Sequence, residues 1–345
     1  MKPSKESITP NERADPAKAP SPLVSIIIPA YKVTRFIAET LDSALAQTYH
    51  NFEIIFVNDG CPDTENLERV LVPYRNRITY IVQSNGGAAA ARNTALMAAK
   101  GDYLAFLDGD DIWKPEYLSM QLRQLATQNC EAIYCNAELF GGNIAHGRTY
   151  MELNPAFGEV SPVSLIKMVC NPITSGMVVK RNVVLSVGLF DTSLPNIGFE
   201  DFDLWFRIAK GGHRIGYHRN VLLRYRVRNT SLSGGLVKQA ERTVVVWETI
   251  RSKYELTPAE AEALVESLQV ANNRLAIERF RESILFGDHE KAQKQLAEVA
   301  EFSTRLKLRF VALIARASPK LFNSAYKMLR PSEFEFVATG RTRAA

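Results

Sequence analysis

The chain has 345 residues, of which 46% are hydrophobic and 23% charged, an ordinary composition for a soluble globular protein with one large or two modest domains. No apolar run approaches the ~20 residues that a membrane-spanning helix needs. Of the net charge of +5, residues 301–345 carry +6, from nine Lys or Arg and three Glu, and the other residues carry −1. A near-neutral body argues against a nucleic-acid-binding groove, so we expect no nucleic-acid partner. The four cysteines lack metal-binding spacing and indicate reduced thiols in a cytoplasmic protein.

Residues 1–22 differ in composition from the rest of the chain. They are rich in Pro, Ser, Lys and Glu and lack the apolar central region of a secretory signal peptide. A segment of this kind cannot bury enough apolar surface to fold by itself. We therefore expect a disordered leader over residues 1–22.

The first half of the chain alternates apolar runs with helical patterns. The apolar runs, rich in β-branched residues, predict four strands, at Val24–Ile28, Phe52–Val57, Ile78–Val82 and Tyr103–Leu107, of which the first and the last should be buried. Helical spacing, or an alanine-rich composition, predicts helices between them at Phe36–Gln47, Asp63–Tyr74 and Ala88–Ala99. Strands that alternate with helices predict βαβ units and a parallel sheet covered on both faces.

The second half has a looser pattern. From about Leu118 to Gly235 we expect loops, short strands and helices, and after Gln239 the chain is helical. Thr257–Glu260 is a capping box with proline at the first helical position. Gly287-Asp288 should end that helix and cap the next one, which gives a helical hairpin.

Polar or turn-forming residues follow each of the four predicted strands. They are Pro29-Ala30-Tyr31, Asp59, Asn85-Gly86-Gly87 and Asp108-Gly109-Asp110-Asp111. Ligands of open α/β sheets bind beyond the carboxyl ends of the strands, so these residues should lie in one site. The last group crowds three carboxylates into four residues, which packing alone does not explain because like charges repel and resist burial. Carboxylates suit Mg²⁺ or Mn²⁺ with a phosphate ligand. The alternative is a solvated acidic turn.

The order and spacing of these motifs resemble those of the family 2 glycosyltransferases. The resemblance extends over roughly Leu23 to Gly234 and rests on five motifs: Val24–Tyr31, Val57–Gly60, Gly86–Asn93, Asp108–Asp111 and Gly198–Trp205. It implies an inverting, metal-dependent enzyme with the GT-A fold, an α/β fold whose Rossmann-like, mostly parallel sheet is flanked by helices.

On this basis we expect three parts after the leader. The GT-A domain should span 23–238, with a nucleotide-binding half at 23–125 and an acceptor half at 126–238. A C-terminal helical extension with a basic amphipathic tail should follow at 239–345.

The resemblance implies roles for the residues that bind the nucleotide. Asp59 would accept a hydrogen bond from a pyrimidine N3–H, and Pro29, Ala30 and Tyr31 would supply a stacking wall. The alternatives are an Asx-turn for Asp59 and core packing for Tyr31. Gly87, with Gly86, permits a close backbone approach.

Arg92, on the following helix, could reach a diphosphate or an acidic neighbour, or could be structural. In the acidic motif, the resemblance assigns Asp110 to the metal, and Asp108 to the ribose and the metal shell, with Gly109 between them in the nucleotide site. Asp111 should cap the following segment or support the metal ligands. The implied cofactor is a divalent cation, Mg²⁺ or Mn²⁺, and the donor substrate is a nucleoside-diphosphate sugar.

The resemblance points to Asp201 as the catalytic base, because inversion by single displacement needs a carboxylate opposite the leaving group. Glu200 would orient the loop or contact the acceptor. In the alternative, both residues form the acidic first turn of a helix. Ser175 is a candidate for the acceptor pocket, and Trp205 stacks on a sugar or belongs to the core.

Arg226 and Arg228 resemble the basic loop that closes over the diphosphate, and in an extended segment they would share one face. An exposed edge strand is the alternative. Near the C-terminus, apolar residues and arginines recur at helical spacing between Arg305 and Arg330. This helix would lie on an anionic membrane surface, or pack on the catalytic domain with a solvated basic face.

We therefore expect transfer of a sugar, in the first instance from a UDP-hexose, to the hydroxyl of a saccharide or lipid-linked acceptor in bacterial surface polysaccharide or glycolipid assembly. The protein would be cytoplasmic, with possible peripheral contact at the inner membrane. A sugar-phosphate nucleotidyltransferase is an alternative, but it predicts a Gly-rich basic loop after the first strand, and Pro29–Lys32 is not such a loop. A non-catalytic nucleotide-sugar-binding protein is another, and it should have lost a carboxylate that this chain retains.

Overall fold

The computed structural model describes residues 21–141, 147–194, 198–227 and 236–286, and also the single positions 288, 291, 292, 294, 295 and 318. Of the predicted leader, only Ser21 and Pro22 are described. The Ser21 carbonyl accepts a 2.6 Å hydrogen bond from the Asn51 side chain, and the Pro22 carbonyl accepts one from the Tyr49 hydroxyl. Arg228 and, apart from Ser318, the predicted basic helix between 305 and 330 lie outside the described residues.

The first four strands form the parallel half of the sheet and confirm the sequence prediction. They are β1 (Val24–Ala30), β2 (Phe52–Asp59), β3 (Thr79–Gln83) and β4 (Tyr103–Phe106). Their order is β3-β2-β1-β4, and every neighbouring pair is parallel. One detail differs: β1 does not end at Ile28, as predicted, but continues through Pro29 to Ala30, and Pro29 pairs in register with Val57.

Four further strands extend the sheet beyond β4 in the order β7-β6-β8-β5. They are β5 (Ile112–Trp113), β6 (Ala132–Phe140), β7 (Met177–Lys180) and β8 (Ile215–Arg226). Strand β7 is antiparallel to both β4 and β6, whereas β8 is parallel to β6 and antiparallel to β5. The direction of the chain therefore reverses at β7, between the two halves.

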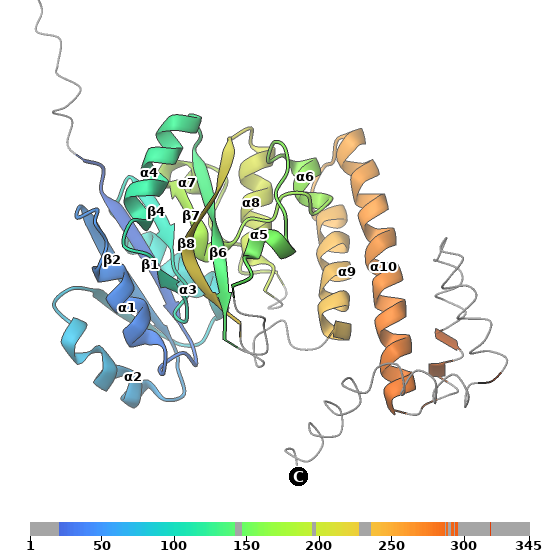
Figure 1. The fold of residues 1–345 in the computed structure, drawn as a ribbon, viewed down its shortest axis with the longest axis horizontal. Coiled ribbons are helices and arrows are strands. Elements are labelled where there is room, and N and C mark those ends of the chain that lie inside the picture. Colours follow the sequence, from blue (N-terminus) through green and yellow to red (C-terminus); the bar gives the residue numbers. More distant parts are fainter. Residues whose placement is uncertain are drawn as a thin grey trace, which may run out of the picture.

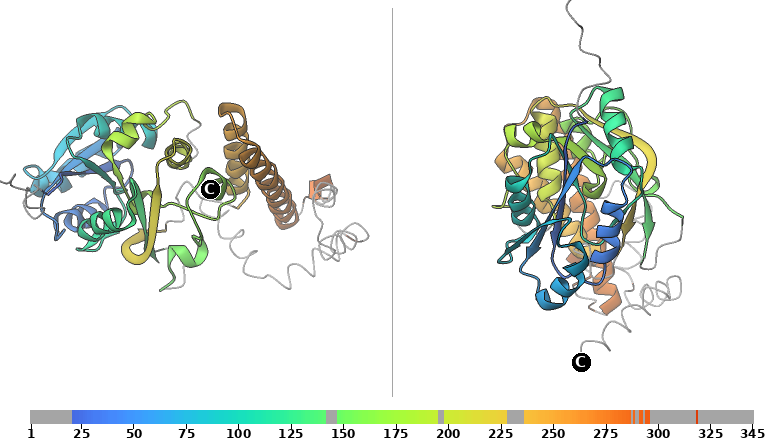
Figure 2. Two further views of the ribbon diagram at one scale, coloured as in Figure 1. Left: turned by 90° about the horizontal axis from the view of Figure 1, so that it is seen from above. Right: turned by 90° about the vertical axis from the view of Figure 1, so that its left-hand side faces the viewer.

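Helices cover both faces of this sheet (Figure 2). The first half contributes α1 (Ile37–Leu45), α2 (Thr64–Leu71) with the 3₁₀ turn Val72–Tyr74, α3 (Gly87–Ala98) and α4 (Tyr117–Gln128). Side chains alternate along β1: Ile26 and Ile28 pack with α1 and α4 in one core, and Ile27 packs with α3 in the other. All three are fully buried, which explains the continuous apolar run in the sequence.

Shorter helices fill the second half, and a long helical pair follows it. The short ones are α5 (Tyr150–Leu153), α6 (Pro162–Ile166), α7 (Arg181–Ser186), α8 (Glu200–Lys210) and the 3₁₀ turn Thr174–Gly176. The pair consists of α9 (Leu236–Lys253) and α10 (Pro258–Phe286), which lie side by side at the opposite end of the molecule from α2 (Figures 1 and 2).

The predicted capping box of α10 is present. The Thr257 amide donates to the Glu260 carboxylate at 2.8 Å, and the Glu260 amide donates to the Thr257 hydroxyl at 3.3 Å. The extension shares a core with the rest of the protein, because Trp247 of α9 packs in one cluster with Phe199 and Phe206. Helix α9 is thus attached directly to α8, the helix that begins with Glu200 and Asp201.

Candidate active site

The carboxyl ends of β1, β2, β3 and β4 lie at one edge of the sheet, as their parallel register requires. At the end of β2, the buried Asp59 carboxylate accepts four hydrogen bonds at 2.7–3.3 Å. The donors are the side chains of Gln83 and Asn85 and the backbone amides of Gly86 and Gly87. These bonds tie the end of β2 to the first turn of α3. Because two donors already face each carboxylate oxygen, a nucleobase N3–H would have to replace one of them.

The tight loop around Asp59 depends on glycine. Gly60 has φ +62°, and a Cβ there would lie 2.7 Å from the Asn85 amide nitrogen. Gly87 has φ +82°, which lets its amide turn towards Asp59. At the end of β1, Ala30 is buried and Pro29 half-buried, whereas Tyr31 is 41% exposed. The exposure of Tyr31 leaves its ring accessible to a ligand.

Gly109 allows the acidic motif to lie close to the end of β1 and the loop that follows it. A Cβ at Gly109 would lie 2.9 Å from Val33 Cγ2 and 3.2 Å from the Pro29 carbonyl oxygen. The Asp108 amide donates to the Ser175 hydroxyl at 3.0 Å, so the motif is also bonded to the 3₁₀ turn Thr174–Gly176. Ser175 itself is 1% exposed, so its contact is with this motif and not with an open acceptor surface.

Asp111 is buried and joins the motif to β8. Its Oδ1 accepts a 2.8 Å hydrogen bond from the Arg226 amide, and its carbonyl accepts from the Thr40 hydroxyl of α1 at 2.9 Å. Burial, with the charges of Asp110 and Asp108, raises the pKa of Asp111 well above the usual range of a carboxyl. Asp111 thus attaches the motif to β8 and α1. Its expected roles, as a cap or as a support for the metal ligands, stay predictions.

The Arg226 guanidinium lies over the same motif. It donates to the Asp110 carbonyl at 2.8 Å and to the Glu39 carboxylate at 2.7 Å, and it stacks on the rings of Phe36 and Phe140. Arg226 thus contacts the acidic motif from the end of β8, the strand next to the two-residue edge strand β5. Its expected role over a diphosphate stays a prediction.

Arg92 of α3 connects the acidic motif with α8. Its guanidinium, which is almost fully buried, donates to Asp108 and to Glu200 at 2.7 Å each. Burial lowers the pKa of Arg92, but the nearby carboxylates of Asp108, Glu200 and Asp201 raise it above its ordinary value, so the residue stays charged. Arg92 was expected to reach either a diphosphate or an acidic neighbour, and in this structure it contacts acidic neighbours.

Asp201 lies in the first turn of α8 and is half-buried. Its Oδ2 accepts a 2.6 Å hydrogen bond from the Thr174 hydroxyl, and its Oδ1 accepts from the Phe202 amide at 2.7 Å. Burial, together with the adjacent charge of Glu200, raises the pKa of Asp201 to about 6. A carboxyl with this pKa is ionised at neutral pH and is basic enough to accept a proton.

Three further residues lie close to these carboxylates. Thr174 bonds to Asp201, Tyr225 lies near the carboxylates of Asp111 and Asp108, and Tyr150 lies near Asp201. Burial and these negative charges raise the pKa of both tyrosines, so both hydroxyls keep their protons. In the sequence, Thr174 adjoins the candidate Ser175 and Tyr225 adjoins the candidate Arg226, whereas nothing in the sequence points to Tyr150.

Trp205 lies in the core and not in the site. It is 1% exposed, and its indole packs edge-on against Phe106 and Phe190. No face of this indole is open to a sugar, so the structure favours the core alternative and corrects the acceptor role expected for it.

The residues of the acidic motif fit a divalent cation. Asp108 is 30% exposed at its side chain and uses Oδ1 for Arg92, which leaves Oδ2 outside that ion pair. Among the described residues, no group of three or more His, Cys, Asp or Glu could hold a metal ion by itself. A Mg²⁺ site does not require such a group, because one or two carboxylates can bind the ion while substrate phosphates and water complete its shell. Among the described helices, none is long and apolar enough to cross a membrane.

Comparison with known proteins identifies the family. Residues 25–183 match the model of "Glycosyl transferase family 2". The E. coli glucosyltransferase WfaP, described as UDP-Glc:alpha-D-GlcNAc-diphosphoundecaprenol beta-1,3-glucosyltransferase, is 33% identical over 67% of this chain and 88% of its own length. The chain belongs to glycosyltransferase family 2. It spans about two fifths of an uncharacterised glycosyltransferase of Rickettsia felis, which is 31% identical over 69% of this chain and 39% of its own length.

Solved structures of low sequence identity share the fold. S. aureus TarS in complex with UDP-GlcNAc superposes with a TM-score of 0.57 at 18% identity, over 88% of this chain and 91% of that one. The mannosyltransferase PcManGT of Pyrobaculum calidifontis, in complex with GDP-Man and Mn²⁺, superposes with a TM-score of 0.58 at 20% identity, over 89% and 84%. The predicted fold class is thereby confirmed: a GT-A sheet flanked by helices, followed by C-terminal helices.

Proposed function

We propose that this family 2 glycosyltransferase moves a hexose from a nucleoside-diphosphate sugar to an acceptor hydroxyl, with inversion at the anomeric carbon. One observation carries the proposal: the acidic motif and the α8 motif meet at a single buried guanidinium, Arg92, which bonds to both Asp108 and Glu200 at 2.7 Å. The leaving-group motif and the candidate base are therefore held in one rigid site. Such preorganisation is what a single displacement requires.

Asp201 accepts the acceptor's proton in this mechanism. As the acceptor oxygen bonds to the anomeric carbon, the bond from that carbon to the diphosphate breaks, and the nucleoside diphosphate leaves with the electron pair. The pKa of about 6 supports this role, because the carboxylate is ionised at neutral pH while still a usable base. The Thr174 hydroxyl donates to one oxygen of Asp201, and the Phe202 amide donates to the other.

Asp108 and Asp110 are the residues that would hold a divalent cation. When bound, the cation would offset the negative charge that develops on the departing nucleoside diphosphate. Tyr31, exposed at the end of β1, is available to stack on the nucleobase, and Asp59 orders the loop that faces it. Arg226 adds a positive charge beside the acidic motif, where we expect the diphosphate to bind.

A polyprenyl-diphosphate-linked saccharide is the acceptor class that we propose, and UDP-glucose the first donor to test. Both follow from the described activity of WfaP, because this chain matches 88% of the length of WfaP. A lipid-linked acceptor also suits a protein that acts at the cytoplasmic face of the inner membrane. Assembly of a surface polysaccharide or glycolipid is the corresponding process.

The test is a transfer assay with UDP-glucose, UDP-GlcNAc and GDP-mannose, each with a polyprenyl-diphosphate-linked GlcNAc acceptor, in Mn²⁺, Mg²⁺ or EDTA. Mass spectrometry detects the product, and NMR of the new anomeric proton reports inversion. We expect Asp110→Ala to lose donor binding, and Asp201→Asn to bind UDP normally without turnover. Full transfer by Asp201→Asn, or retention of configuration, would contradict the mechanism.

A further inference from the structure

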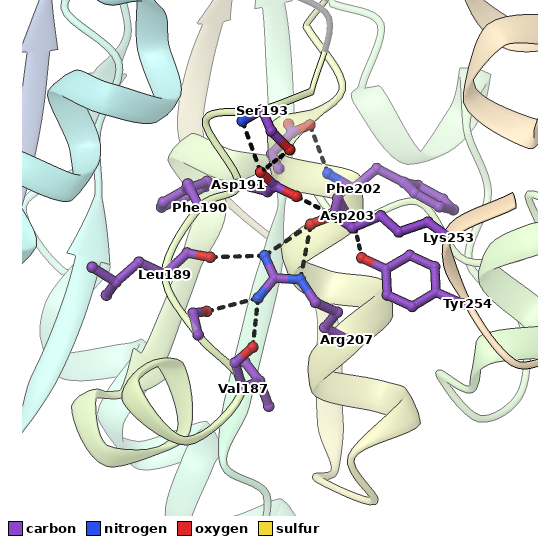
Figure 3. Close-up of polar contacts among 12 residues, drawn as sticks. Val187, Leu189, Phe190, Asp191, Ser193, Phe202, Asp203, Arg207, Lys253 and Tyr254 are labelled. Carbon is purple, nitrogen blue, oxygen red and sulfur yellow. Dashed lines mark hydrogen bonds and ion pairs between the residues drawn. The ribbon is translucent and has the colours of Figure 1, made fainter. Parts of the chain in front are cut away.

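A polar cluster around a buried aspartate joins α8 to the end of α9 (Figure 3). Its centre is Asp203, two residues after the proposed base and fully buried. Oδ2 of Asp203 accepts from two nitrogens of Arg207 at 2.8 Å, and Oδ1 accepts from Lys253 at 3.0 Å and from the Tyr254 hydroxyl. Four donors therefore surround one carboxylate, which is the number that its two oxygens can accept.

Arg207 extends the cluster to the segment before α8. Its remaining N–H groups donate to three consecutive backbone carbonyls at 2.7–2.8 Å, those of Val187, Gly188 and Leu189. Figure 3 shows the guanidinium enclosed by these carbonyls on one side and by Asp203 on the other. All five of its N–H groups are used, so Arg207 fixes this segment relative to α8.

The next residues of the same segment contact the donor half of the site. The backbone of Phe190 exchanges two hydrogen bonds with the Asn93 side chain of α3, at 2.7 and 2.9 Å. The Phe190 ring lies 5.4 Å from the guanidinium of Arg92. The segment thus runs from the Asp203 cluster to the residue that bonds to Asp108 and Glu200.

Lys253 closes the cluster from the other side. It is the last residue of α9, and its ammonium donates to Asp203 at 3.0 Å and to Asp191 at 2.5 Å. Burial opposes its charge, but the bonds to Asp191, Tyr254 and Asp203 raise its pKa above the ordinary value of a lysine. One ammonium of the extension therefore holds both the first turn of α8 and the segment before it.

We infer that Lys253 and Tyr254, in the C-terminal extension, are positioning residues for catalysis: through Asp203 and Asp191 they hold the proposed base Asp201 against the donor site. The inference rests on the proposed function in assigning the base to Asp201. Both residues lie outside residues 25–183, the range that the family model matches. They touch neither substrate nor the reacting atoms, and they act by fixing the turn that carries Asp201.

Two other ion pairs between the extension and the body serve as matched controls. Lys210, at the far end of α8, bonds to Glu260 of α10 at 2.8 Å, and Lys167 bonds to Glu266 of α10 at 2.8 Å. Neither pair includes Asp203 or a residue of the segment 187–193. Lys210→Met and Lys167→Met therefore loosen the attachment of the extension without releasing the first turn of α8.

The experiment compares Lys253→Met, Lys253→Arg and Tyr254→Phe with these two controls in the full chain. We expect Lys253→Met to lower kcat for transfer by roughly tenfold to a hundredfold while KM and Kd for the donor stay unchanged, since a small displacement of a reacting group has this effect. Lys253→Arg keeps a cation that can donate to both carboxylates and should restore most of kcat. Tyr254→Phe keeps the ring and should lower kcat several-fold in a fully folded protein. The controls should keep the native kcat.

Amide hydrogen exchange gives a readout that does not need the reaction. In Lys253→Met, exchange should accelerate at residues 187–193 and 200–203, but not in Lys210→Met. If the native chain transfers sugar and Lys253→Met matches it in kcat and exchange, the inference fails. It also fails if Lys210→Met lowers kcat equally, or if donor affinity falls in parallel with kcat. If the native chain transfers no sugar, the proposed function fails, and the exchange comparison alone decides whether Lys253 fixes this turn.

Discussion

The Thr174 hydroxyl donates a 2.6 Å hydrogen bond to Oδ2 of Asp201. The two residues come from different elements, the 3₁₀ turn before β7 and the first turn of α8. The bond lowers the pKa of Asp201 and so opposes burial, which raises it. Asp201 is thus a carboxyl whose basicity results from two opposing effects, and each effect can be changed separately.

The first prediction concerns the pH dependence of the reaction. With a pKa of about 6, Asp201 is protonated below that pH and cannot accept a proton, so kcat/KM should fall about tenfold per pH unit below about pH 6. Thr174→Val removes the bond that stabilises the carboxylate, so the acid limb of the profile should move to higher pH. Rates measured with UDP-glucose from pH 4.5 to 8.5 check both statements. If the acid limb of the Thr174→Val profile stays at the pH of the native protein, Asp201 does not determine the fall of kcat/KM at low pH.

The second prediction concerns the stability of Asp201→Asn. A carboxyl whose pKa rises from 3.8 to about 6 on folding favours the folded state fully below pH 3.8, and this contribution is lost as the pH rises through 6. Asparagine carries no charge at any pH. The variant should therefore be more stable than the native chain above pH 6, by up to about 3 kcal/mol, and the difference should vanish near pH 4.

Urea unfolding at pH 4 and pH 8 measures this difference. Asp191→Asn is a contrasting control, because burial is outweighed there by the bonds to Lys253 and Ser193, which lower the pKa of Asp191 to about 2. Removing that charge should destabilise the protein at pH 8. If Asp201→Asn destabilised the protein at pH 8 as much as Asp191→Asn did, the carboxyl would not have a raised pKa.

Much of the parallel half of the sheet could be predicted from the sequence. Strands β1 to β4 begin and end within two residues of the predicted ranges. Strands β1, β2 and β4 are largely buried and so consist of nearly continuous apolar runs, whereas the half-exposed edge strand β3 is recognised by its β-branched and aromatic residues. The antiparallel half was predicted only as a loose region. Strand β5 has two residues and β7 has four, too few for a periodic pattern, and their place depends on pairing with distant β8 and β4.

The candidate site was predictable to a similar extent. Asp59 and Asp108 follow buried strands, so their common location follows from topology alone. The partners of Arg92 were not predictable, since Glu200 lies 108 positions away and approaches only in the folded chain. Trp205 shows the opposite limit: an aromatic residue on a helix has the same pattern whether it packs in a core or stacks on a sugar, and only its burial decides.

The third prediction concerns Arg92. Replacement by methionine keeps much of the side-chain volume but leaves the carboxylates of Asp108 and Glu200 without their shared cation. Breaking a buried ion pair in this way should cost about 3–5 kcal/mol in the free energy of unfolding. Transfer activity should also fall by at least a hundredfold, because both motifs lose their fixed position. Arg92→Met/Glu200→Gln should recover part of the stability and none of the activity, as measured by urea unfolding and initial rates.

The fourth prediction tests the contact between the acidic motif and the β1–α1 loop. In Gly109→Ala, the new methyl group would lie 2.9 Å from Val33 Cγ2, 3.0 Å from Ile37 Cδ1 and 3.2 Å from the Pro29 carbonyl oxygen. The two side chains can shift, but the carbonyl belongs to β1 and cannot move without displacing Ala30 and Tyr31. We expect a loss of about 1–3 kcal/mol in stability and a weaker Kd for UDP, measured by calorimetry. Gly109→Ala/Val33→Ala should recover stability but not UDP affinity, since it relieves only the side-chain clash. Native UDP affinity in Gly109→Ala would show that the nucleotide does not depend on this approach of the two loops.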